Sequence, residues 1–168
     1  MKRFLGLLTI IVTISIMFLF LTSCSGPMGS TSTSGQKITQ AIDTGSWTFT
    51  ATMVRPQFGG SRQPNGFYTV IFSPGNLNVY LPYFGRTFGT ADVLDGDNPL
   101  NFISKDFQMK KELIKQGKWR ISFVPKDKQR QVQNLVFVIF ENGNATLDVT
   151  MTSRTPISYN GSVTATKP

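Results

Sequence analysis

The stretch Trp47-Thr48-Phe49-Thr50-Ala51-Thr52-Met53 alternates strictly between apolar and polar side chains. Because successive side chains of a β-strand point to opposite faces, this pattern predicts a strand with one buried face and one face of threonines. The strand is expected to end at Arg55-Pro56, since proline has no backbone N–H to donate to a neighbouring strand. Trp47, Phe49, Ala51 and Met53 are the side chains expected to point inward.

Strand and turn signals recur along the rest of the chain. Seven further segments carry strand patterns: 66–72, 76–81, 107–114, 118–124, 129–140, 145–152 and a last one around Ile157, Tyr159 and Val163. Ser73-Pro74-Gly75-Asn76 and Asn142-Gly143 are hairpin turn sequences. Residues 135–140 are apolar on both faces and are expected near the middle of the sheet. The sequence therefore predicts an all-β fold, an antiparallel sandwich or flattened barrel of about eight strands arranged mostly as a meander.

The region before the first strand has a different composition. Residues 37–43 are expected to form one short helical turn, with Ile38 and Ile42 four residues apart on one face. Residues 24–36 contain no charge and are mainly serine, threonine and glycine, which predicts a flexible tether. A single β-domain over residues 37–168 follows from this division.

The N-terminus has the pattern of an export signal. Lys2 and Arg3 precede an apolar run over residues 4–21, and Thr22-Ser23 precedes Cys24, which is the only cysteine of the chain. This order resembles a bacterial lipoprotein signal. The resemblance implies that residues 1–23 are a signal peptide, that Cys24 is acylated, and that the protein is held at the outer membrane facing the periplasm. The alternative is an uncleaved membrane-spanning helix, for which eighteen apolar residues are roughly the minimum.

Few residues for catalysis are available. The chain contains no histidine, and acylation would consume its single thiol, which excludes serine-histidine and cysteine-histidine catalysis. Asp92, Asp95, Asp97 and Asn98 crowd one loop, and their oxygen atoms would suit calcium. Their order does not match an EF-hand loop and these residue types also form turns, so no metal site and no cofactor are expected. A hydrolase that uses two carboxylates is the remaining enzymatic alternative, and it requires two acids in one cleft. The expectation is a protein without catalytic activity.

The positive charge is concentrated in one part of the chain. The net charge is +8, and residues 105–130 contain nine basic and three acidic side chains. In one interpretation these lysines form a solvated strand face that blocks edge-to-edge pairing. In the other they contact anionic lipid headgroups or glycans, and nucleic acid is not expected as a partner of an exported, tethered domain. The candidates for anionic-surface contact are Lys110, Lys111, Lys115, Lys118 and Arg120.

Aromatic side chains are densest at Tyr80, Tyr83, Phe84 and Phe88, with Arg86 among them and with Pro82 and Gly85 in the same stretch. One interpretation is a hydrophobic plug that closes one end of the sheets, with Arg86 stacked on an aromatic ring. The alternative is the lip of a ligand site, where the aromatic side chains bury an apolar or sugar-like ligand and Arg86 fixes a polar group. Tyr80, Tyr83, Phe84 and Arg86 are therefore candidates for ligand binding.

Four segments carry a resemblance to a known family: 80–86 (YLPYFGR), 99–102 (PLNF), 119–123 (WRISF) and 142–147 (NGNATL). They resemble the bacterial lipoprotein family called domain of unknown function 4251, over roughly residues 38 to 165. The resemblance implies a single exported all-β domain. It implies no catalytic residues, because no activity is established for the family.

Two functions are expected from these observations. The first is a lipid-anchored envelope protein whose β-domain binds an envelope protein, a glycan or an apolar small molecule without catalysis. The second is a lipocalin-like carrier of a small apolar ligand, which needs a cavity of roughly 300 Å³ or more lined by inward-facing aromatic residues.

Overall fold

The computed structural model describes residues 31–88, 98–129 and 131–166. The chain divides into two compact units, Met1–Ser30 and Thr31–Pro168, and all the described helices and strands lie in the second. Cys24 and the expected signal peptide lie outside the described residues. Within the described ranges, no helix is both long enough and apolar enough to cross a membrane.

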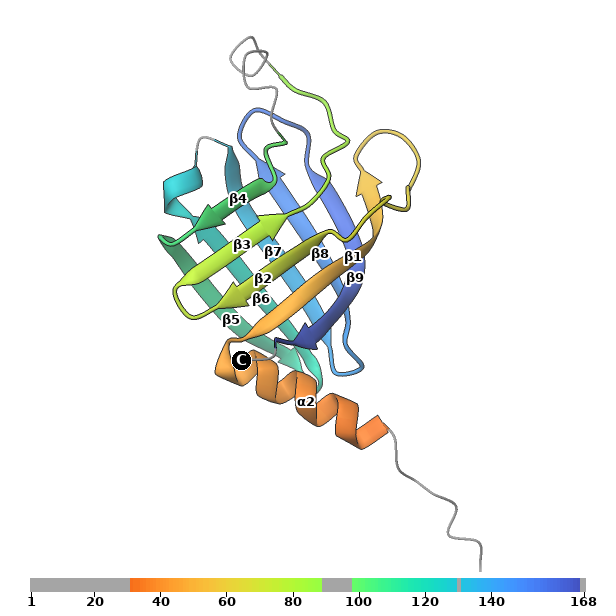
Figure 1. Ribbon diagram of the computed structural model, residues 1–168, viewed down its shortest axis with the longest axis vertical. Coiled ribbons are helices and arrows are strands. Elements are labelled where there is room, and N and C mark those ends of the chain that lie inside the picture. Colours follow the sequence, from red (N-terminus) through yellow and green to blue (C-terminus); the bar gives the residue numbers. More distant parts are fainter. Residues whose placement is uncertain (1–30, 89–97, 130, 167–168) are drawn as a thin grey trace, which may run out of the picture. The chain divides into compact units, whose positions relative to one another are not determined.

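A single antiparallel sheet of nine strands forms most of the domain (Figure 1). The strands are β1 (Trp47–Pro56), β2 (Thr69–Ser73), β3 (Asn76–Tyr80), β4 (Asn101–Ser104), β5 (Phe107–Lys115), β6 (Lys118–Pro125), β7 (Val132–Phe140), β8 (Asn144–Met151) and β9 (Ile157–Ala165). Their order is β4-β3-β2-β1-β9-β8-β7-β6-β5. Strands β1–β4 and strands β5–β9 each form a meander, and the pairing of β1 with β9 joins the two into one sheet. Figure 1 shows β1–β4 crossing over β5–β8, which makes the sheet a curled half-barrel. The expected all-β antiparallel meander is confirmed, and its two edges are β4 and β5.

The sequence did not predict β4. This strand has only four residues, and its two buried side chains are Phe102 and Ser104. Because one of the two is polar, the alternation of apolar and polar residues that marks the other strands is missing. The position of β7 also differs from the expectation, since β9 is the middle strand and β7 lies two strands from the β5 edge.

The first strand contains a bulge that changes its inward-facing residues. Trp47, Phe49 and Ala51 are buried as predicted, but the pairing of β1 with β9 shifts between Ala51 and Met53. A bulge inserts one extra residue and reverses the alternation beyond it. The prediction that Met53 points inward is therefore wrong, and Val54 is the fully buried residue instead.

The predicted hairpin turns are present. Gly75 joins β2 to β3 with a φ of 76°, and Gly143 joins β7 to β8 with a φ of 85°. Residues with a side chain rarely adopt such angles, so glycine is required at both turns.

Aromatic rings fill the inside of the half-barrel. Trp47, Phe123 and Phe137 are almost completely buried, and the ring centroids of Trp47 and Phe137 are 5.0 Å apart in an edge-to-face arrangement. Tyr159 is also buried, and its hydroxyl donates a 2.7 Å hydrogen bond to the carbonyl of Pro82.

One helix, α2 (Thr31–Thr44), lies across one end of the half-barrel, beside the end of β9 (Figure 1). It is longer than the single turn that was predicted, and it includes residues 31–36, which were assigned to the tether. Ile38, Ala41 and Ile42 are buried and form its apolar face, as their spacing of three and four residues requires. Packing of this face stabilises a helix whose serine and threonine content does not favour one.

Candidate functional site

The inner side of edge strand β5 is left partly uncovered. Met109, Lys111 and Leu113 pair with Phe123, Ile121 and Trp119 of β6, so they point to the same face as the core. Because the strand order ends at β5, Met109 is 46% and Leu113 64% exposed. Two adjoining cavities lie between this side of β5 and helix α2, and together we call them the groove.

The first cavity, the Trp47 chamber, is mainly apolar. It has a volume of about 340 Å³, and its walls include Ile42, Trp47, Phe72, Phe107, Met109 and Ile121. The Nε1–H of Trp47 is buried, and no described residue accepts a hydrogen bond from it. A buried donor without an acceptor costs about 1–3 kcal/mol of stability.

The second cavity, the Trp119 chamber, is larger and more polar. Its volume is about 680 Å³, and its walls include Thr39 of α2, Leu113 of β5, Gln116 in the β5–β6 turn, Trp119 of β6 and Glu141 in the β7–β8 turn. It therefore offers one aromatic ring among several polar side chains.

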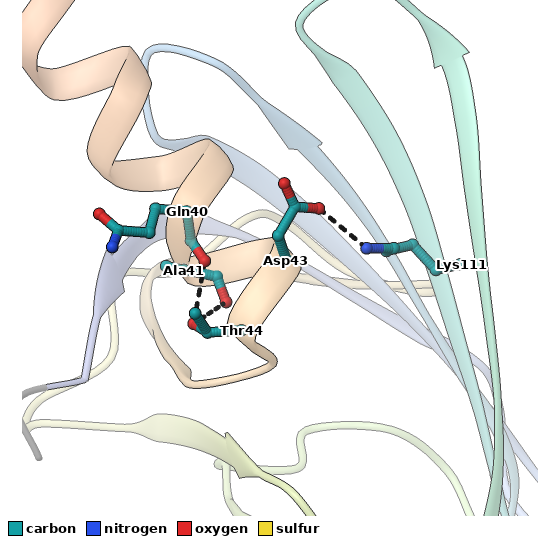
Figure 2. A network of polar contacts seen from close by, with 5 residues as sticks. All are labelled: Gln40, Ala41, Asp43, Thr44 and Lys111. Atoms are coloured by element: carbon teal, nitrogen blue, oxygen red, sulfur yellow. Dashed lines mark hydrogen bonds and ion pairs between the residues drawn. The ribbon is translucent and has the colours of Figure 1, made fainter.

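An ion pair spans the groove where the two chambers adjoin. Asp43 of α2 and Lys111 of β5 line both chambers, and Lys111 Nζ lies 3.0 Å from Asp43 Oδ1. Figure 2 shows the two side chains reaching toward each other from the end of α2 and from the strand. The side chains of Asp43 and Lys111 are 63% and 38% exposed, so the pair contributes only about 0–1 kcal/mol and separates easily.

The backbone of α2 ends beside this ion pair. The Thr44 hydroxyl lies 2.9 Å from the carbonyl oxygen of Gln40 and 3.3 Å from that of Ala41 (Figure 2). The carbonyl of Ala41 also accepts a 3.1 Å hydrogen bond from the backbone N–H of Ser46. These bonds close the last turn of α2, which carries Asp43.

The predicted aromatic cluster lies elsewhere, and none of its residues lines either chamber. The Tyr83 hydroxyl donates a 2.9 Å hydrogen bond to the carbonyl of Thr155, and burial raises the pKa of this tyrosine. The guanidinium of Arg86 lies over the ring of Phe58 at 5.1 Å. These contacts agree with the plug interpretation for Tyr83 and Arg86.

Two members of that cluster remain on the surface. Tyr80 is 46% exposed and stacks on Tyr68 at 5.3 Å, while Phe84 is 42% exposed beneath Arg62. A role of the cluster as a ligand lip stays a prediction.

The predicted basic surface is divided between the two faces of the sheet. Lys110, Lys118 and Arg120 lie on the outer face, whereas Lys111 lies on the inner face beside Asp43. Lys115 is exposed at the end of β5. Glu112 lies 2.5 Å from Lys110 and 3.7 Å from Arg120, and the hydrogen bond from Lys110 lowers the pKa of Glu112. Contact with an anionic surface therefore stays a prediction for Lys110, Lys115, Lys118 and Arg120. Glu112 neutralises part of the charge of this group.

The remaining predicted residues give little further information. Asp92, Asp95 and Asp97 of the acidic loop lie outside the described residues, and Asn98 contacts backbone groups of Leu81 and Leu100. In the ranges that the structure describes, no three acidic, cysteine or histidine residues are grouped as metal ligands.

Sequence reasoning missed the groove. Asp43, Glu141, Met109 and Leu113 were not candidates, because each lies in a different pattern along the chain. The only usable signal was the alternation in residues 107–113, which places Met109 and Leu113 on the same side as Phe107. That this strand is an edge could not be deduced from the alternation.

Comparison with known proteins gives a family and a fold. The family described as "Domain of unknown function (DUF4251)" matches residues 30–163. The crystal structure of a DUF4251 family protein from Bacteroides eggerthii DSM 20697 is similar with a TM-score of 0.53 and 15% sequence identity, over 79% of this chain and 88% of that protein. Among curated proteins, none matches the chain. At this identity the structural likeness concerns the fold alone.

Proposed function

This chain belongs to the DUF4251 family, and we propose that it is a lipid-anchored, non-catalytic envelope protein that binds a small, mainly apolar ligand in the groove. Cys24 is the proposed point of lipid attachment, and the outer membrane facing the periplasm is the proposed location. The Trp47 chamber is the proposed binding site.

The observation that carries this proposal is the Trp47 chamber itself. Its volume of about 340 Å³ falls within the usual range for small-molecule sites, and Trp47, Phe72 and Phe107 supply aromatic walls. Lys111, whose side chain is 38% exposed, also lines the chamber and gives it a hydrogen-bond donor. An apolar ligand with one acceptor oxygen matches this combination.

Tryptophan fluorescence tests the proposal, because the chain has only two tryptophans and each lines one chamber. We use residues 25–168 and titrate them with 1-octanol. In the variant Trp119→Phe, all tryptophan emission comes from Trp47, and we expect it to change saturably with octanol. Unchanged Trp47 emission at all octanol concentrations would contradict the proposal.

A matched pair of variants locates the site. Met109→Arg replaces an apolar wall of the Trp47 chamber with a longer, charged side chain and should abolish the response, because an apolar chain gains nothing from contact with a hydrated charge. Gln108→Arg is the control, since this neighbouring exposed residue points to the opposite face of β5. Equal octanol binding by the two variants would show that the ligand binds outside the groove.

A further inference from the structure

Glu141 lines the Trp119 chamber, and no described basic residue forms an ion pair with its carboxylate. The other two ionisable residues that line this chamber are Asp43 and Lys111, and these two pair with each other. The described lining therefore carries one uncompensated negative charge, that of Glu141.

Two glycines make room for the Glu141 side chain. A methyl group on Gly35 of α2 would lie 2.8 Å from both Cγ and Oε1 of Glu141, and one on Gly117 would lie 2.5 Å from Oε2. Contacts this short do not occur, so a side chain at either position would displace the carboxylate. The backbone N–H of Glu141 also donates a 2.8 Å hydrogen bond to the carbonyl of Gly117. The carboxylate is thus held between the helix and the β5–β6 turn.

The aromatic ring of Trp119 belongs to the same chamber. A tryptophan face attracts a cation, and a carboxylate beside it adds a direct charge interaction. An anionic group would instead meet Glu141 and would have to compete with Asp43 for Lys111. The chamber therefore favours a positively charged group.

We propose that the ligand of the groove is an amphiphile with a cationic head, such as a primary amine on an apolar chain. The head lies in the Trp119 chamber near Glu141, and the apolar chain lies in the Trp47 chamber, passing the Asp43–Lys111 pair. This inference rests on the proposed function, because it assumes that the groove binds an apolar chain.

Three probes with the same chain and different heads test the inference: octylamine, 1-octanol and octanoate. Binding to residues 25–168 is measured at neutral pH by tryptophan fluorescence, below the concentrations at which the probes form micelles. We expect octylamine to bind about fivefold more tightly than octanol, as for a partly exposed charge interaction, and octanoate to bind most weakly. The amine advantage should shrink as salt is added.

Two variants test the role of Glu141. Glu141→Gln should abolish the preference for octylamine and leave octanol binding unchanged. Gly35→Ala should also lower octylamine affinity, because the methyl group displaces the carboxylate, although alanine favours the helix and should not destabilise the fold. Glu112→Gln is the control, since it removes the same charge from the outer face of β5.

The outcomes separate the two proposals. If octanol binds but octylamine has no advantage, or if Glu141→Gln weakens both probes equally, the cationic head is wrong while the apolar groove remains. If no probe binds, the proposed function and this inference are both wrong.

Discussion

Tyr159 is a core residue whose burial makes the stability of the domain depend on pH. The ring is fully buried, and its hydroxyl donates to the carbonyl of Pro82. Burial raises the pKa of Tyr159 far above its ordinary value, and the nearby Tyr83 raises it further. The folded protein therefore keeps this proton at pH values where the unfolded chain loses it.

This difference predicts alkaline destabilisation. The stabilising contribution is fully present below the unfolded pKa of about 10, and it is lost as the pH rises above that value, by up to roughly 1.4 kcal/mol per pH unit. Urea unfolding at a series of pH values above about 8 measures the effect. Tyr159→Phe should be less stable at neutral pH by about 1 kcal/mol, through loss of the hydrogen bond, but should show a shallower alkaline slope. An identical slope in the variant would contradict the assignment to Tyr159.

At the scale of elements, helix α2 matters because it forms one wall of the groove. Ile38 is buried against the end of the sheet, and its Cδ1 lies 3.7 Å from where a Cβ on Gly143 would be. Ile38→Ala should lower the free energy of unfolding by about 2–4 kcal/mol, measured by chemical denaturation. Gln40→Ala on the exposed side of the same helix should change it by less than about 0.5 kcal/mol. Equal stability of the two variants would mean that the helix does not pack as described.

The alternation of apolar and polar residues predicted most of the strands, but it did not predict the groove. Alternation identified β1 and the strands that bury one apolar face, because burial on one side is a local property of each strand. It could not identify β4, whose inward residues include Ser104, or the bulge that turns Met53 outward. The groove depends on which strand is the edge and on how far α2 extends, and both follow from packing between distant segments.

The charge pattern could not show which face of the sheet each basic residue occupies. The nine basic residues of 105–130 lie close together in the sequence, so they suggested one basic surface. In a strand, neighbouring residues point to opposite faces, and Lys110 and Lys111 are separated in this way. Only the register of β5 with β6 shows that Lys111 belongs to the groove.

At the scale of the whole molecule, the proposal joins a membrane anchor to a binding domain. The helix, the strands and the core of the described residues all lie from Thr31 onward, so attachment at Cys24 and folding are expected to be independent. Cys24→Ser should remove the protein from the membrane fraction while leaving its thermal unfolding temperature unchanged. Incorporation of labelled palmitate measures the acylation directly, and labelling that persists in Cys24→Ser would exclude this cysteine as the site.

The central claim is that the groove between β5 and α2 holds an apolar ligand. The most direct test is a crystal structure of residues 25–168 with octanol that carries bromine on its terminal carbon, located by anomalous scattering. We predict the bromine in the Trp47 chamber, beside Trp47, Phe72 and Met109. Bromine at the surface around Tyr80 and Phe84, with the groove unoccupied, would contradict the account.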